Sequence, residues 1–238
     1  MKVTYWKRIP STRFVDDSVL RELQGGRSGV CGHRNVGAKI SALMLYIALG
    51  LCAEEEEVDG EGRFLRASPT YDELQNLTGL SRPLIATALS VLDELKLIER
   101  EQQGRGATYQ LTGYNPSRGW CKVPFRAISK KVSGSVQIEP FRHFKKRGLM
   151  ELYALKLFLY LLAIRDNDTS ESRVSYELIS ARTAIPRSFI RKTGTFLLSS
   201  GLLSNIYQNS YQNHDDLDGE GGANKYYVTG FKDLLVRR

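Results

Sequence analysis

The chain is poor in the residues that build disulfide frameworks and metal sites. It has only three cysteines and three histidines among 238 residues. Cys31, Cys52 and Cys121 are scattered, odd in number and form no CxxC pair. This pattern argues against disulfide bonds or a structural zinc and favours a reducing cytoplasm.

Long apolar segments are also missing. The N-terminus begins MKVTYWKRIP and has no apolar signal region. The longest apolar run, residues 40–53, is too short to span a bilayer, and the next one, residues 149–164, contains Glu151 and Lys156. We expect both runs to form buried helices of a soluble protein without a membrane partner.

Motifs of catalysis and cofactor binding are absent from the sequence. There is no GxxxxGK[ST] phosphate loop, no HExxH pair, and no recognisable pattern around a serine or cysteine nucleophile; His33, His143 and His214 are isolated. The acidic stretches 54–62 and 213–220 only faintly resemble calcium loops, because the closing glutamate is missing. We expect no catalytic activity, no cofactor and no metal, and we expect both acidic stretches to be solvated loops.

Positive charge is in excess and is unevenly distributed. The formal net charge is +8, which is typical of proteins that meet nucleic acid or another anionic surface. Residues 1–114 contain 14 basic and 15 acidic side chains, whereas residues 115–238 contain 20 and 11. Contact with phosphates is therefore expected mainly from the second half.

The sequence contains an internal repeat. Six short blocks recur in the same order, and their spacing changes only across stretches that we expect to be loops. The matching blocks are residues 6–10 and 120–124, 42–49 and 154–161, 70–74 and 175–179, 78–82 and 183–187, 95–98 and 200–203, and 108–114 and 225–231. The repeat predicts two domains, residues 1–114 and 115–238.

Each unit has the same predicted order of elements. In the first unit a buried helix is followed by the acidic loop, and Thr70 and Glu73 then form a capping box that begins a short helix. Gly79 makes a tight turn, and Ser81 caps an amphipathic helix. A two-stranded hairpin with its tip at residues 103–106 completes the unit.

This order resembles a winged helix-turn-helix domain. The residues that carry the resemblance are 71–74, 78–82, 95–100 and 104–106 in the first unit, and Tyr176, 183–187 and 200–203 in the second. The second unit departs from the pattern at Ala184, where a glycine is usual, and in its long acidic hairpin tip at residues 208–224. The expected fold is mainly α with small β-hairpins (α+β), in two tandem winged helix-turn-helix domains.

A pair of such domains is similar to plasmid replication initiators and to some bacterial transcription regulators. The resemblance implies a cytoplasmic, nucleoid-associated bacterial protein that binds double-stranded DNA. In this fold the second helix of the motif enters the major groove. The predicted contact residues on the two second helices are Ser81, Arg82, Thr87 and Ser90, and Arg187, Ser188, Arg191, Lys192 and Thr195.

Basic residues outside the two helices are further candidates. Arg105 lies at the tip of the first hairpin, where it resembles an arginine placed against a minor groove or a phosphate. The cluster Lys145, Lys146 and Arg147 precedes the second buried helix and is of a kind that contacts phosphates. Trp6 and Trp120 are expected to dock the start of each unit on its own domain.

Three functions are compatible with these observations. The first is a sequence-specific DNA-binding transcription regulator without catalysis, and the second is a replication initiator of a plasmid or another mobile element that binds origin repeats. The third is a winged-helix scaffold for a protein partner, bound through the first domain or the acidic loops. The sequence leaves the target DNA and the choice between monomer and homodimer open.

Overall fold

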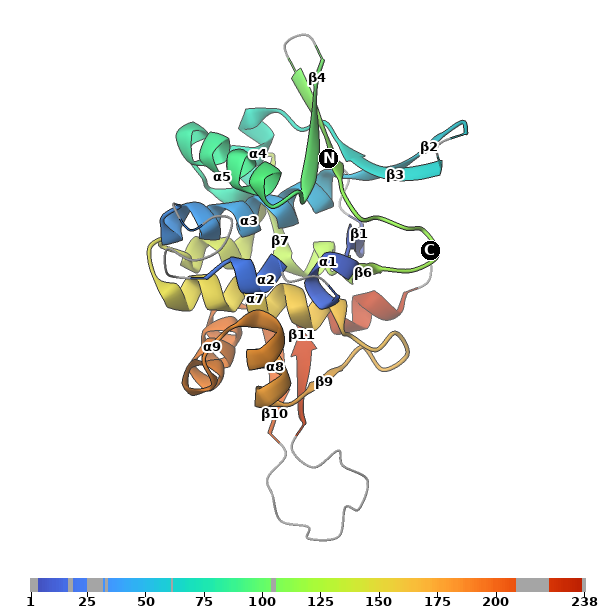
Figure 1. Cartoon of the computed structure of the whole chain (residues 1–238). Coiled ribbons are helices and arrows are strands. Elements are labelled where there is room, and N and C mark those ends of the chain that lie inside the picture. Colours follow the sequence, from blue (N-terminus) through green and yellow to red (C-terminus); the bar gives the residue numbers. More distant parts are fainter. Residues whose placement is uncertain are drawn as a thin grey trace, which may run out of the picture.

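The computed structural model of the chain describes residues 4–16, 19–24, 32, 34–60, 62–103, 106–208 and 223–236. The fold is mixed α+β with small antiparallel sheets, as the sequence predicts at that level. Residues 17–18, 25–31, 33, 61, 104–105 and 209–222 lie outside the described part, as do both ends of the chain. Figure 1 shows two helices crossing the middle of the molecule, with further helices and hairpins above and below them.

The first half contributes one long central helix and a four-stranded sheet. Its elements are β1 (Lys7–Pro10), α1 (Thr12–Val15), α2 (Val19–Glu22), α3 (Val36–Cys52), β2 (Glu54–Val58), β3 (Gly62–Ala67), α4 (Tyr71–Thr78), α5 (Arg82–Glu94), β4 (Ile98–Gln103) and β5 (Gly106–Leu111). The strand order is β2-β3-β5-β4. Helix α5 packs against the central helix α3.

The second half repeats much of this arrangement, but a hairpin and a 3-10 helix precede its central helix where the first half has α2. Its elements are β6 (Trp120–Val123), α6 (Phe125–Ile128), β7 (Ser129–Val132), β8 (Ser135–Ile138), η1 (Glu139–His143), α7 (Leu149–Ala163), β9 (Ser172–Val174), α8 (Tyr176–Thr183), α9 (Arg187–Ser200), β10 (Leu203–Tyr207), β11 (Asn224–Val228) and η2 (Phe231–Leu235). The order β9-β11-β10 corresponds to β3-β5-β4 of the first half, where β2 is an added edge strand. Helix α9 packs against α7 as α5 packs against α3.

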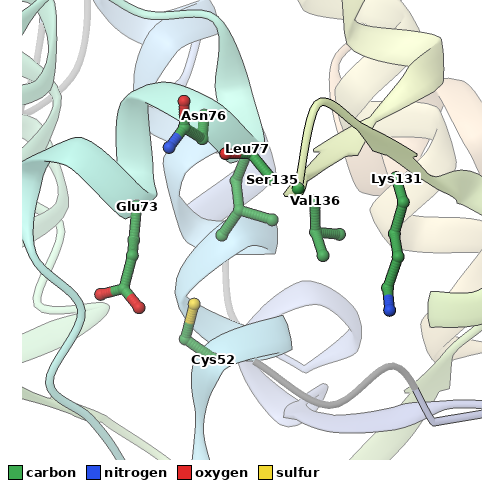
Figure 2. A pocket seen from close by; sticks show the side chains of 8 residues that line it. Cys52, Glu73, Asn76, Leu77, Lys131, Ser135 and Val136 are labelled. Atoms are coloured by element: carbon green, nitrogen blue, oxygen red, sulfur yellow. The ribbon is translucent and has the colours of Figure 1, made fainter.

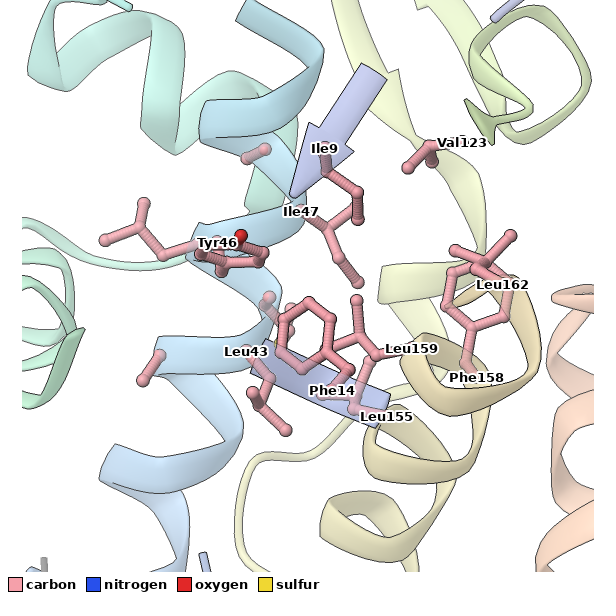
Figure 3. Close-up of a cluster of buried hydrophobic side chains, with 14 of the residues drawn as sticks. Ile9, Phe14, Leu43, Tyr46, Ile47, Val123, Leu155, Phe158, Leu159 and Leu162 are labelled. Carbon is pink, nitrogen blue, oxygen red and sulfur yellow. The ribbon is translucent and has the colours of Figure 1, made fainter. Parts of the chain in front are cut away.

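The core is shared between the two halves. Helices α3 and α7 are apolar on almost all sides and pack against each other. Figure 3 shows Phe14, Leu43 and Ile47 from the first half meeting Leu155 and Leu159 from the second. Because burying one such side chain contributes roughly 1.5–3 kcal/mol, this contact binds the two halves into one body.

A two-stranded ribbon closes the same junction. Strand β1 pairs antiparallel with β6, which joins residues 110 to 116 positions apart, as in Arg8 opposite Lys122. The rings of Trp6 and Trp120 stack with their centroids 6.2 Å apart. The expectation that each tryptophan docks on its own unit is therefore wrong, because β1 and β6 bring both rings to the boundary between the units.

The acidic stretch 54–62 is not a loop. Strands β2 and β3 form a hairpin across it, which extends from the body in Figure 1. The hairpin places Glu55 beside Arg8 and 3.3 Å from Arg63, and it places Glu56 3.6 Å from Arg66. These ion pairs offset the repulsion between neighbouring glutamates, so an acidic segment forms an edge strand here.

The turns between α4 and α5 and between α8 and α9 have the same geometry. Gly79 (φ 67°) and Ala184 (φ 52°) both take the left-handed conformation that ends the preceding helix. In each turn a threonine hydroxyl, of Thr78 or Thr183, donates to a carbonyl one turn earlier at 2.6 Å. Ser81 occupies the N-cap position of α5, but its side chain makes no capping hydrogen bond, contrary to the sequence prediction.

The difference between the two turns predicts opposite effects of substitution. Ala184→Gly should raise the free energy of unfolding by about 0.5–1 kcal/mol, because glycine takes the left-handed conformation without strain. Gly79→Ala should lower it by a similar amount, since a Cβ there meets no other atom and the cost is conformational alone. Urea denaturation of both variants would check this. Destabilisation by Ala184→Gly would contradict the assigned turn geometry.

Two buried lysines lie where the central helices meet the end of α2. The Lys156 ammonium donates to the Leu23 carbonyl at 3.0 Å, and the Lys39 ammonium donates to the Gln24 carbonyl at 2.7 Å. Both side chains are fully buried. Burial, together with the charge of Lys39, lowers the pKa of Lys156 to about 7.

This shifted group makes stability depend on pH. Between about pH 7 and pH 10.5 the unfolded chain holds a proton on Lys156 that the folded chain does not, so the free energy of unfolding should rise with pH in that window. Lys156→Met should remove this part of the slope, whereas Met at the exposed Lys130 should leave it unchanged. Denaturation curves at pH 7, 8 and 9 would measure it. Equal slopes for the wild type and Lys156→Met would contradict a neutral buried amine.

Candidate nucleic-acid interface

Helix α9 presents a polar, basic face to solvent. Ile190, Thr193, Gly194 and Leu197 are buried against the body. The predicted contact residues are all exposed on the remaining face: Arg187, Ser188, Arg191, Lys192 and Thr195. The helix contains no acidic residue. The alternation of buried and exposed positions follows the helical period, so the five side chains gather along one side.

The first residue of each second helix is held by an acid on the helix before it. Arg187 forms an ion pair with Glu177 of α8, and Arg82 forms one with Asp72 of α4 at 2.7 Å. The pKa of Glu177 is lowered, first by its own backbone amide and further by Ser175 and Arg187. All four side chains are largely exposed. Exposed ion pairs contribute little free energy, so these two pairs orient the arginines and are broken at little cost.

Helix α5 is a weaker candidate than α9. Ser81 and Arg82 are exposed, but Thr87 is half-buried and donates to the Pro83 carbonyl at 2.9 Å. Ser90 accepts a hydrogen bond from Arg34 at 2.6 Å and faces Glu94. The structure thus leaves Arg82 as the only basic side chain that α5 itself supplies, next to a cavity of about 390 Å³ that Arg100 also lines.

The basic segment of Lys145, Lys146 and Arg147 is shaped by a buried carboxylate. Glu151, in the first turn of α7, accepts the backbone amide of Lys145, that of Lys146 at 3.2 Å and that of Arg147 at 2.9 Å. Its side chain is 6% exposed. Because the carboxylate faces the backbone, the side chains of Lys145 and Arg147 are left to solvent, and that of Lys146 is half-buried.

Contacts of the residues on either side of the basic segment hold it next to α9. Phe144, just before the segment, packs edge-on against Phe196 of α9 with centroids 5.2 Å apart. Just after the segment, the Thr193 hydroxyl lies 3.5 Å from the sulfur of Met150. The structure therefore brings the three basic residues beside the helix that carries Arg191 and Lys192, although about 40 residues separate them in the sequence.

Two predicted features fall outside the described part of the chain. Arg105 and the neighbouring Gly104 belong to the tip of the β4–β5 hairpin, and the acidic stretch 213–220 belongs to the tip of the β10–β11 hairpin. The strands that lead to both tips are described, and they follow α5 and α9 directly.

A small cavity of about 240 Å³ lies between the end of α3, α4 and the β7–β8 hairpin. Figure 2 shows Cys52, Glu73 and Lys131 around it. Burial, with a smaller contribution from Glu73, raises the pKa of the Cys52 thiol to about 12, so the thiol is protonated at neutral pH. Glu73 is committed to the capping box of α4. The described residues contain no group of three or more His, Cys, Asp or Glu side chains that could hold a metal.

Sequence reasoning missed the acidic partners of the two arginines and the role of Glu151. The repeat contains a signal for the acidic partners. Asp72 and Glu177 are 105 residues apart in the sequence, and so are Arg82 and Arg187. Glu151 gave no signal, since its equivalent in the first unit is Lys39.

Comparisons with known proteins place the chain in no family. No family model matches it, and no curated protein matches it. Among solved structures it is similar to a chain from "The crystal structure of I-DmoI in complex with DNA and Ca", at 14% identity, over 84% of this chain and 87% of that one, with a TM-score of 0.23. A TM-score this low says nothing about shared fold or function. Within the described residues, no helix is both long and apolar enough to cross a membrane.

Proposed function

We propose that the chain is a tandem winged helix-turn-helix protein that binds double-stranded DNA sequence-specifically and has no catalytic activity. The observation that carries this proposal is the exposed face of α9, where Arg187, Ser188, Arg191, Lys192 and Thr195 lie together without an acidic neighbour on the helix. Arginine contacts guanine through two hydrogen bonds, and the shorter polar side chains contact bases or phosphates.

The surroundings of α9 support the same role. A short helix and a left-handed turn precede it and a hairpin follows it, which is the order of a helix-turn-helix with a wing. Lys145, Lys146 and Arg147 add positive charge beside the helix and suit phosphate contact. The first unit has the same order of elements but fewer basic groups, so it adds site choice or holds a protein partner.

The proposed process is regulation of transcription in the bacterial cytoplasm. Replication initiation is the second candidate, and the two units within a single chain favour it, because one molecule could then cover one origin repeat. Mapping the bound sites in the genome separates the two processes. Sites next to promoters support regulation, and arrays of repeated sites support initiation.

Base contact by α9 can be tested with one substitution. Arg191→Ala should weaken binding to the preferred site by roughly 1–3 kcal/mol and relax the preference at one base pair. Gel-shift titrations over single-base variants of the site would measure this. Arg118→Ala, in the exposed turn before β6, removes the same charge elsewhere and should change neither quantity. Equal weakening on every variant would make Arg191 a phosphate contact, and no change would refute the assignment of α9.

Phosphate contact by the basic segment should appear in the salt dependence. Replacing Lys145, Lys146 and Arg147 by alanine should lower the slope of log affinity against log salt by about 2–3, since each phosphate contact on duplex DNA contributes roughly 0.9. The preference between sites should remain. Alanine at the exposed Arg118 and Lys232 is the control and should leave the slope unchanged. An unaltered slope in the triple variant would place this segment away from DNA.

A further inference from the structure

The β1–β6 ribbon shows how the two halves are related in space. Arg8 lies opposite Lys122, which is its own equivalent in the repeat. Lys7 lies opposite Val123, and Ile9 lies opposite Cys121, so each residue on one side of the central pair has its equivalent on the other side. A register of this kind arises only when a two-fold axis passes through the middle of the ribbon.

The aromatic contacts obey the same axis. Trp6 and Trp120 are equivalent residues, and they stack on each other. The Arg8 guanidinium lies 4.4 Å from the ring centroid of Trp120, and the Lys122 ammonium lies 4.5 Å from that of Trp6. Each half thus places its cation on the tryptophan of the other half, which is the exchange that a two-fold axis produces.

Outside the ribbon, too, elements of each half pack against the other half. The β8 strand of the second half packs against α4 of the first half, and the α2 helix of the first half packs against α8 of the second. In both cases the leading segment of one unit covers the first helix of the motif in the other. The two units are therefore arranged about a local two-fold axis.

The axis places α5 and α9 on one side of the molecule. Arg34, just before α3, bonds to Ser90 and Glu94 of α5, and Met150, in the first turn of α7, contacts Thr193 of α9. A Cβ added at Gly37 would lie 2.5 Å from the Lys146 carbonyl oxygen, so α3 and α7 begin next to each other. Figure 1 shows α5 above and α9 below these two beginnings.

From this arrangement we infer that one chain binds two half-sites in inverted orientation, as a symmetric homodimer would. The inference rests on the proposed DNA binding and specifies its target. Two motifs related by a two-fold axis meet the duplex from opposite strand directions, so the operator mirrors the symmetry of the protein. Motifs related by simple translation along the DNA would instead require a direct repeat.

The halves are not equal, and this makes the target asymmetric. At the positions of Arg191 and Lys192, α5 has Ala86 and Thr87. The half-site under α9 should therefore carry most of the sequence preference, and the natural site should be an imperfect inverted repeat with half-site centres about one helical turn apart.

The inference can be tested by giving α5 the exposed residues of α9. The full-length variant carries Pro83→Ser, Ala86→Arg, Thr87→Lys and Ser90→Thr; Arg82 already matches Arg187. Three duplexes are titrated: one α9 half-site beside scrambled sequence, two such half-sites inverted, and two in direct repeat. The variant should bind the inverted duplex at one chain per duplex and roughly tenfold or more tightly than the other two. Inserting about half a helical turn between the half-sites should abolish this gain.

Two controls separate orientation from charge and from misfolding. Asp168→Lys, in the exposed turn before β9, adds the same two units of charge and should strengthen binding to all three duplexes equally. Hydroxyl-radical footprints of the wild type on its natural site need no variant, and the protections on the two strands should mirror each other about the centre.

The outcomes distinguish this inference from the function on which it rests. A preference of the variant for the direct repeat, or footprints repeated by translation, would overturn the inverted arrangement while DNA binding stood. Protection of the α9 half-site alone would overturn it as well. Failure of the wild type to select any sequence over random duplex would refute the proposed function itself.

Discussion

The contact between α3 and α7 is the constraint on which the rest of the structure depends. Both helices are apolar on nearly every side, so neither can be covered by the short elements of its own unit. Each helix buries one side against the other and further sides against the helix pair of its own unit, α4 and α5 in one case and α8 and α9 in the other. The positions of both helix pairs follow from this single apolar contact.

The ribbon of β1 and β6 fixes the relative orientation of the two units across that contact. Apolar helix surfaces alone tolerate more than one relative orientation, because dispersion and burial are not directional. Backbone hydrogen bonds and a stacked tryptophan pair are directional, and they hold the two units about one axis. Lys39 and Lys156 add a polar contact from both central helices to the end of α2, at the cost of two buried amines.

On this symmetric frame the exposed residues have diverged. Buried positions of α5 and α9 keep apolar or small side chains, as in Ile85 and Ile190, whereas the exposed Ala86 corresponds to Arg191. A change on the solvent side alters charge without disturbing packing, so one unit can gain affinity for an anionic partner while the other keeps only its shape. The ion pairs of Arg82 and Arg187 persist in both units because they join the two helices of each motif.

The sequence by itself determined the repeat, the mixed α+β class, the two central helices and the basic character of α9, since all of these depend on local pattern and composition. It misassigned residues 54–62, where ion pairs across a hairpin overcame the repulsion that acidic residues suggest. Only the tertiary structure decided that Trp6 and Trp120 stack across the junction and that Glu151 shapes the basic segment. It alone also brought the basic segment next to α9, through Phe144 and Phe196, and set the units about an axis, because these contacts join residues far apart in the chain, and no local periodicity specifies them.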